Sequence, residues 1–195
     1  MLLRPANPAY PAAPGSATLY SDLDYLALGL VVENISGLRL DKFVEQELYQ
    51  PLGIEALFFN PLDAPHRPRD YAATEHCPWR GGVLSGAVHD DNAYVLNGVA
   101  GHAGLFGTAR AVFTLLQALL SAYRGEAGSD LLTPDLVRAF WQRSGDSGWT
   151  LGFDTPSATQ PAVAGLSLMP MGTDSLPPRR GKGDKMRRTA SVWWR

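Results

Sequence analysis

Residues 51–107 show no sustained hydrophobic periodicity, although the segments on either side of them predict helices. The stretch contains the single cysteine, the four histidines and many glycines. A segment of this length without regular structure in a compact domain forms a functional surface more often than a plain connector. We therefore expect a functional surface here, between flanking helices.

Two helices are predicted before this stretch. Ser21 can cap the first, and Asp24 three residues later completes a pair similar to a capping box. Gly37 fits the C-terminal cap of this helix. A second helix is predicted over residues 40–49, with Pro51 ending it. The apolar residues of the first helix recur at helical spacing, at Tyr25, Leu28, Gly29, Val32 and Ile35.

Two more helices are predicted after the stretch. Thr108 can cap the first of them and Gly125 can end it. Thr133 followed by Pro134 favours another helix that reaches Trp141. Residues 149–153 predict a short strand. One face of the helix that begins after Thr108 is marked by Ala109, Val112, Phe113, Leu116, Leu119, Leu120 and Tyr123.

The composition sets further limits. With 195 residues, 45% apolar and 18% charged, the chain suits one ordinary globular domain. One cysteine excludes a disulfide framework within the chain, and a net charge of -2 argues against nucleic-acid binding. No apolar run approaches the roughly 20 residues of a membrane span. The proline-rich N-terminus does not resemble a secretory signal, and these observations leave the compartment undetermined.

The charge is unevenly distributed. Residues 1–165 contain 10 basic and 17 acidic residues, whereas residues 166–195 contain 7 basic and 2 acidic ones. We therefore divide the chain into a folded domain over 1–165 and a basic tail over 166–195. The tail could be an arm for nucleic acid or a membrane. We favour a disordered terminus or translation outside the natural reading frame, because nothing else in the chain suits nucleic acid.

Several motifs of hydrolases are absent. No serine lies in G-x-S-x-G, no lysine lies in S-x-x-K, and no lysine begins K-T-G. The spacings of the histidines, the cysteine and the nearby acidic residues match no zinc pattern. We therefore expect neither a metal ion nor a cofactor.

Three segments nevertheless resemble one family. They are Y-S-D-L-D-Y-L-A-L-G-L-V-V-E-N-I-S-G with its continuation to P-L-G-I (20–54), T-E-H-C-P-W-R-G-G-V-L-S-G-A-V-H-D-D-N-A (74–93) and G-V-A-G-H-A-G-L-F-G-T-A-R-A-V-F-T-L-L (98–116). In order and spacing they are similar to segments of the β-lactamase-related serine hydrolases, which include class C β-lactamases, penicillin-binding-protein-like peptidases and esterases. The L-G-F-D-T-P-S turn also fits, so that the resemblance extends over about residues 14–165.

The resemblance implies an α+β fold in which a helical domain joins an antiparallel sheet. It implies that this chain supplies mainly the helical portion of a β-lactamase/transpeptidase-like fold and lacks most of the sheet. We therefore expect exposed apolar surface on residues 109–123 and 149–153, and association through it.

The resemblance also assigns roles. Family enzymes attack with the serine of S-x-x-K, and the lysine and the tyrosine of Y-x-N transfer its proton. Here Tyr20 matches that tyrosine, so we assign it as the catalytic residue, although its nucleophile is absent from this sequence. Asp22 stands where the motif has asparagine. An amide donates a hydrogen bond to a substrate carbonyl, whereas an ionised carboxylate cannot. Asp22 therefore contacts substrate differently, or it only stabilises the start of the helix.

Three more residues are candidates for binding substrate: His102, His89 and Trp79. The H-A-G at His102 matches H-x-G in letters only, since it precedes a helix, and the family motif lies on a later strand. The spacing of Gly98, Gly101 and Gly104 favours tight backbone turns here. His89 and Trp79, together with Asp90, could border a pocket or pack within the loop.

The predicted function is that of a β-lactamase-related serine hydrolase acting by acyl transfer on a small-molecule or peptide substrate. The chain lacks the S-x-x-K nucleophile and the K-T-G or H-x-G strand, so we expect a fragment without activity of its own. The alternative is a non-catalytic remnant of the same fold that keeps a binding cleft.

Overall fold

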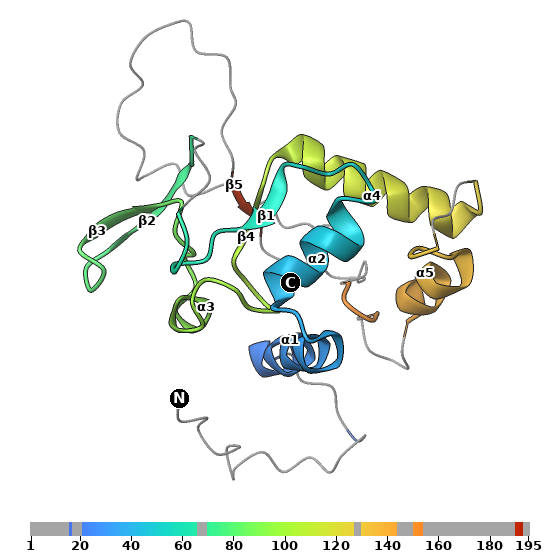
Figure 1. The fold of residues 1–195 in the computed structure, drawn as a ribbon, viewed down its shortest axis with the longest axis horizontal. Coiled ribbons are helices and arrows are strands. Elements are labelled where there is room, and N and C mark those ends of the chain that lie inside the picture. The colour runs from blue at the N-terminus through green and yellow to red at the C-terminus, as the bar shows by residue number, and fades with distance from the viewer. Residues whose placement is uncertain are drawn as a thin grey trace, which may run out of the picture.

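The computed structural model describes residues 16, 21–65, 70–126, 130–143, 150–153 and the backbone of 190–192. These residues form a mixed helical and antiparallel structure, in agreement with the predicted α+β class (Figure 1). The elements in chain order are α1 (Asp22–Ser36), α2 (Leu40–Val44), the π-helical turn η1 (Glu45–Tyr49), β1 (Leu57–Phe59), β2 (Ala73–Cys77), β3 (Gly82–Ser85), α3 (Asp91–Val95), β4 (Leu105–Gly107), α4 (Ala109–Arg124), α5 (Pro134–Trp141) and β5 (Ala190–Val192).

Four of these strands come from the stretch without periodicity. β1 pairs with β4 in antiparallel register, with Leu57 opposite Gly107, and β4 pairs in turn with β5. β2 and β3 form a separate antiparallel hairpin, shown to one side of the helices in Figure 1. These strands have only three to five residues, too few to produce a clear alternation in the sequence.

The caps of α1 agree with the prediction, and its buried face agrees in part, since Gly29 is buried and Tyr25 and Val32 are half-buried, whereas Leu28 is exposed. Ser21 accepts a hydrogen bond from the backbone of Leu23, and Gly37 ends the helix with a φ of 69°. The buried residues are Leu26 and Gly29, whereas Ile35 is 80% exposed. Glycines set this packing because α1 runs close to the chain at Gly101. A Cβ on Gly29 would lie 3.3 Å from the amide nitrogen of Gly101.

The last two predicted helices are confirmed. Thr108 accepts from the backbone of Ala111 to cap α4, Gly125 ends it, and Thr133 caps α5 by accepting from Leu136. α4 packs its buried side chains on β1, β4 and η1. The core there consists of Tyr49, Ile54, Leu57, Leu105, Ala111, Val112 and Leu115.

The predicted strand over residues 149–153 is wrong for the part that the structure describes. Residues 150–153 form a turn in which the Thr150 amide donates to the Phe153 carbonyl at 2.9 Å. Gly152 has a φ of 87°, which reverses the chain and prevents an extended strand. Trp149 lies outside the described residues. The turn is attached to α5, because the Leu151 amide donates to the Phe140 carbonyl.

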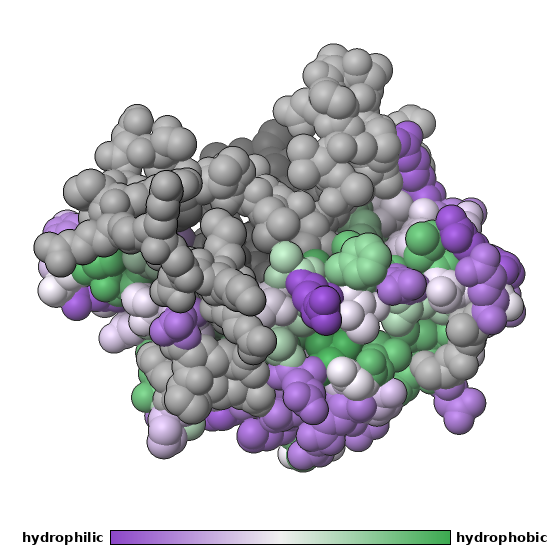
Figure 2. All heavy atoms as spheres, turned by 90° about the horizontal axis from the view of Figure 1, so that it is seen from above, coloured by the Kyte–Doolittle hydropathy of each residue, from purple (hydrophilic) through white to green (hydrophobic). Residues whose placement is uncertain are grey.

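Apolar side chains remain exposed on several elements. Leu28 of α1, Phe113 of α4 and Leu151 are each more than half exposed, as expected for 109–123 and for the described part of 149–153. Green apolar patches are visible among polar residues on the face in Figure 2. Among the described residues, none of the helices has both the length and the apolar character needed to span a membrane.

Candidate active site

Three polar side chains from separate elements converge at one place. Asp22 is the first residue of α1, Asp90 is the N-cap of α3, and His102 lies in the turn between α3 and β4. One nitrogen or oxygen atom from each of the three lies within 4.8 Å of the corresponding atoms of the other two. We call these three residues the Asp–His cluster. It combines two candidate substrate-binding residues, Asp22 and His102, with Asp90, which the sequence analysis considered only as a pocket-border residue.

The geometry between Asp90 and His102 is specific. His102 Nε2 lies 2.8 Å from Asp90 Oδ1, and the same oxygen accepts the backbone N–H of Ala93 at 2.7 Å. An ionised carboxylate accepts hydrogen bonds but does not donate them, so the proton between the two side chains resides on Nε2. Asp90 therefore caps α3 and orients the imidazole with one oxygen atom.

The other ring nitrogen of His102, Nδ1, is buried as well. The side chain of His102 is 2% exposed, and its Nδ1 finds no hydrogen-bond partner in the described part of the chain. A buried N–H without an acceptor costs more than a buried lone pair of the imidazole. The arrangement thus favours the tautomer with its hydrogen on Nε2 over the one with its hydrogen on Nδ1.

Asp22 and Asp90 are both half-buried, whereas His102 is buried. The two carboxylates are therefore the members of the cluster that solvent reaches. Two carboxylates and an imidazole could accept a substrate N–H, exchange a proton, or hold a divalent cation.

Glycines shape the turn that carries His102. Gly98 and Gly104 have φ values of 81° and 107°, so both occupy the left-handed region that favours glycine. A Cβ on Gly101 would collide with the backbone carbonyl oxygen of Tyr25 in α1. The glycine spacing therefore serves tight turns and close backbone approach, as predicted, and this approach brings His102 beside the start of α1.

The other predicted site residues either have side chains that are not part of the cluster or lie outside the described residues. His89 Nε2 lies 2.9 Å from a carboxylate oxygen of Glu75, and Trp79 is 60% exposed on the turn of the β2–β3 hairpin. Tyr20, the predicted catalytic residue, is not among the described residues.

Arg80 is a residue of this region that the sequence analysis did not single out. Its side chain is 3% exposed, and its guanidinium lies over the rings of Trp79 and Tyr94. The signal in the sequence was P-W-R-G-G, where an arginine follows a tryptophan at a turn. That pattern does not reveal burial, because most arginines at turns are solvated.

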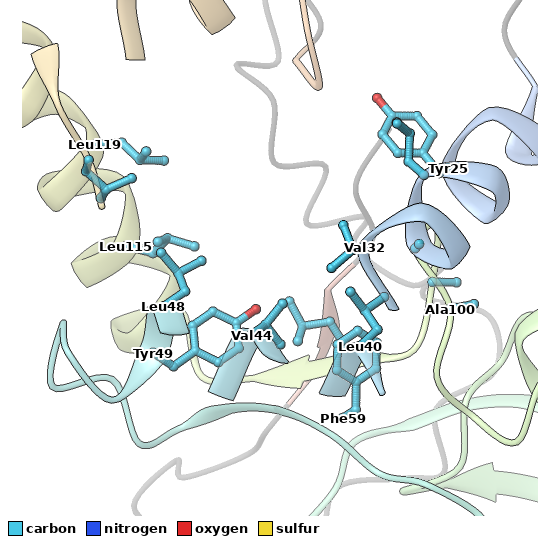
Figure 3. Close-up of a pocket in the computed structure, with 16 residues that line it drawn as sticks. Tyr25, Val32, Leu40, Val44, Leu48, Tyr49, Phe59, Ala100, Leu115 and Leu119 are labelled. Atoms are coloured by element: carbon cyan, nitrogen blue, oxygen red, sulfur yellow. The ribbon is translucent and has the colours of Figure 1, made fainter. Parts of the chain in front are cut away.

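An apolar cavity of about 370 Å³ lies between α1 and α4, and its lining includes Gly101 and Ala103, the chain neighbours of His102. Figure 3 shows Tyr25 and Val32 of α1 facing Leu115 and Leu119 of α4 across it. Burial raises the pKa of Tyr49 strongly, and burial followed by the Asp24 charge raises that of Tyr25. Both phenols therefore stay protonated near neutral pH. The lining suits apolar groups and offers no acid or base that is active at that pH.

Comparisons with known proteins give a consistent picture. A family model described as Beta-lactamase matches residues 2–187, which extends beyond the 14–165 of the resemblance. A protein of Escherichia coli K12 named "Putative D-alanyl-D-alanine carboxypeptidase" is 36% identical over 172 residues, covering 75% of this chain and 39% of that protein. The "N-acetylmuramyl-L-alanine amidase" of Bacillus subtilis is 38% identical over 164 residues, covering 77% of this chain and 34% of that protein. The chain thus spans less than half the length of these relatives.

Solved structures support the same fold. A penicillin-binding protein from Bacillus halodurans superposes with a TM-score of 0.53 at 22% identity, covering 80% of this chain and 44% of that one. A structure titled SurE with D-Leu gives a TM-score of 0.50 at 29% identity, covering 78% of this chain and 36% of that one. Each similarity covers most of this chain but less than half of the solved one.

Proposed function

This chain belongs to the beta-lactamase family of serine hydrolases, and from that membership we propose that it forms part of an acyl-transfer site for amide substrates. The names of two relatives describe a carboxypeptidase for D-alanyl-D-alanine and an amidase for N-acetylmuramyl-L-alanine. Both names refer to an amide bond next to an alanyl residue. The substrate class proposed for this chain is therefore a peptide or muramyl-peptide amide of that kind.

The observation that carries the proposal is the Asp–His cluster at the start of α1. Asp22 comes two residues after Tyr20, the proposed proton-transfer residue, so the cluster lies beside the position where family enzymes handle the proton of the attacking serine. In this proposal Asp22 accepts an N–H of the substrate. Asp90 and His102 lie beside Asp22 and set the local charge and shape.

The chain as given performs no acylation in this proposal. Its sequence contains no S-x-x-K, so it offers neither the nucleophilic serine nor the lysine that would lower the pKa of a tyrosine. A phenol has an ordinary pKa near 10 and is a poor base at neutral pH without such a cation. The 195 residues therefore contribute Tyr20 and Asp22 to the site in this proposal, and a binding remnant without catalysis is the alternative.

A labelling experiment tests the statement about activity. The purified chain is incubated with a serine-reactive phosphonate and examined by intact-mass spectrometry, with the Bacillus subtilis relative as the positive control. We expect an adduct on the relative and none on this chain. A stoichiometric adduct on this chain that depends on Tyr20 would overturn the proposal and show a nucleophile outside S-x-x-K.

A binding experiment tests the role of Asp22. An acetylated D-alanyl-D-alanine peptide is titrated into the wild-type chain and into the D22N, D22A and D135A variants, and amide shifts are followed by NMR. If Asp22 accepts a substrate N–H, both D22N and D22A weaken binding, while D135A, at a fully exposed side chain of α5, does not. If Asp22 only stabilises the helix, none of the variants changes peptide binding when the comparison is made on fully folded protein.

A further inference from the structure

The turn of the β2–β3 hairpin carries a charged side chain that is almost completely buried. Arg80 is 3% exposed, and its guanidinium carbon lies 4.5 Å from the ring centre of Trp79 and 4.3 Å from that of Tyr94. The two rings are perpendicular, with centres 5.4 Å apart. Stacking of this kind fixes the plane of the guanidinium and therefore the directions in which its N–H groups donate.

Those N–H groups donate to the loop that precedes α3. One terminal nitrogen donates to the Val88 carbonyl at 2.6 Å. The other donates to the His89 carbonyl at 2.9 Å and to the Asp91 carboxylate. Two of these acceptors are backbone carbonyls that precede Asp90 in the chain, and the third is the side chain of Asp91, which follows it. Arg80 therefore fixes the backbone before Asp90 and bonds to the side chain of the residue after it.

The position of the Asp90 carboxylate depends more on a fixed loop backbone than that of an ordinary N-cap does. Its Oδ1 accepts from Ala93 and from His102 at the same time, at 2.7 Å and 2.8 Å, so a small rotation of the carboxylate would break one of the two bonds. The Nε atom of Arg80 has no partner in the described part of the chain, which adds to the cost of burying this cation. An apolar side chain would fill the same space between two rings without that cost.

We propose that Arg80 is a positioning residue, which holds Asp90 so that His102 keeps its hydrogen on Nε2 and its orientation toward Asp22. This inference rests on the proposed function only for its consequence in catalysis. The positioning itself is a property of the described residues and is measurable without any substrate.

The test uses the 195-residue chain labelled with ¹⁵N and long-range imidazole NMR spectra. In the wild type we expect one His102 tautomer with its hydrogen on Nε2. Arg80→Met keeps an unbranched side chain that can pack between the two aromatic rings but removes every donor. In this variant we expect loss of the single tautomer and, because the loop opens more often, about tenfold faster solvent exchange of the Nε2 proton. Arg39→Met is the matched control, because within the described part of the chain Arg39 donates to Asp41 and Asp63 and not to the loop before α3.

Each result has one meaning. An unchanged His102 tautomer and exchange rate in folded R80M overturn the proposal, as does an equal change in R39M. If R80M does not fold, Arg80→Lys decides, because lysine keeps the charge but cannot bond to all three acceptors at once. A partial loss of the single His102 tautomer in R80K supports the proposal, and an unchanged tautomer in R80K overturns it. Failure of the peptide titration or of the labelling experiment would affect the proposed function and would leave this result unchanged.

Discussion

His102 and Asp90 meet through Nε2 and Oδ1 at 2.8 Å, and the same oxygen caps α3 through the Ala93 amide. One carboxylate thus links the start of a helix to a buried imidazole on a different turn. This link makes Asp90 both a stabilising residue of the fold and the support of the Asp–His cluster.

We expect D90A to reduce the free energy of unfolding by about 2–4 kcal/mol. About 1 kcal/mol comes from the lost cap, and about 1–3 kcal/mol from leaving the His102 N–H buried without an acceptor. Urea denaturation followed by circular dichroism measures the difference. D135A removes a 99% exposed carboxylate and is the control, with an expected change within about 0.5 kcal/mol. Equal effects of the two substitutions would contradict a structural role of the Asp90–His102 bond.

We expect G101A to destabilise the chain by about 1–3 kcal/mol, because its new Cβ collides with the Tyr25 carbonyl oxygen and pushes α1 away. G29A is the companion variant on the opposite side of the same contact. Its Cβ meets Gly101 at 3.3 Å, but a helix interior gains about 1 kcal/mol when glycine becomes alanine. Thermal unfolding should therefore show a clearly larger decrease in stability for G101A than for G29A. A smaller loss for G101A than for G29A would mean that α1 does not pack this closely.

The buried phenol of Tyr49 predicts a loss of stability at alkaline pH. Burial raises its pKa in the folded chain above the ordinary value near 10 that applies in the unfolded chain. The contribution of the protonated phenol is complete below pH 10. It decreases above that pH, because the unfolded chain releases the proton first, and it is lost once the folded pKa is passed.

The free energy of unfolding is measured in the wild type and in Y49F at neutral pH and above about pH 10. Since phenylalanine has no proton to release, we expect a smaller decrease between the two conditions in Y49F. Tyr25 also has a raised pKa, so Y25F serves as a comparison at a less buried phenol. A decrease of the same size in the wild type and in Y49F would show that Tyr49 is not held protonated by burial.

The apolar cavity between α1 and α4 predicts binding of hydrophobic dyes. Leu28 borders it and is 57% exposed, so we expect strong fluorescence of anilinonaphthalene sulfonate in the native chain and less in L28Q. V83Q is the control, since Val83 is 63% exposed on β3, away from the cavity. Equal dye binding in both variants would place the apolar surface elsewhere. Sedimentation at several concentrations tests the expected association.

The helices of this chain could be predicted from the sequence because their signals are local. Thr108 and Thr133 cap α4 and α5 through bonds to residues three positions later, and Gly125 ends α4 with a φ of 72°. Caps of this kind and a spacing of 3.6 residues depend only on near neighbours in the chain. The buried face of α1 could be predicted only in part. The helix runs close to Gly101 at the Tyr25 carbonyl and at Gly29, and hydrophobic periodicity takes no account of a contact that depends on a missing side chain.

The family, and Asp22, His102 and Tyr20 as candidate residues, also followed from short sequence motifs, and the comparisons confirmed the family. The sequence did not indicate that Asp22, Asp90 and His102 share one place, nor that Arg80 holds the loop between them. Asp22 is far from Asp90 and His102 along the chain, and α1 reaches them where it runs close to Gly101. The contacts of Arg80 and the Asp90–His102 bond join residues 8 to 12 positions apart, beyond the reach of helical periodicity. Local propensity determined the helices and their ends. The tertiary structure alone decided which polar groups meet, because a hydrogen bond such as Asp90–His102 depends on distances that folding creates.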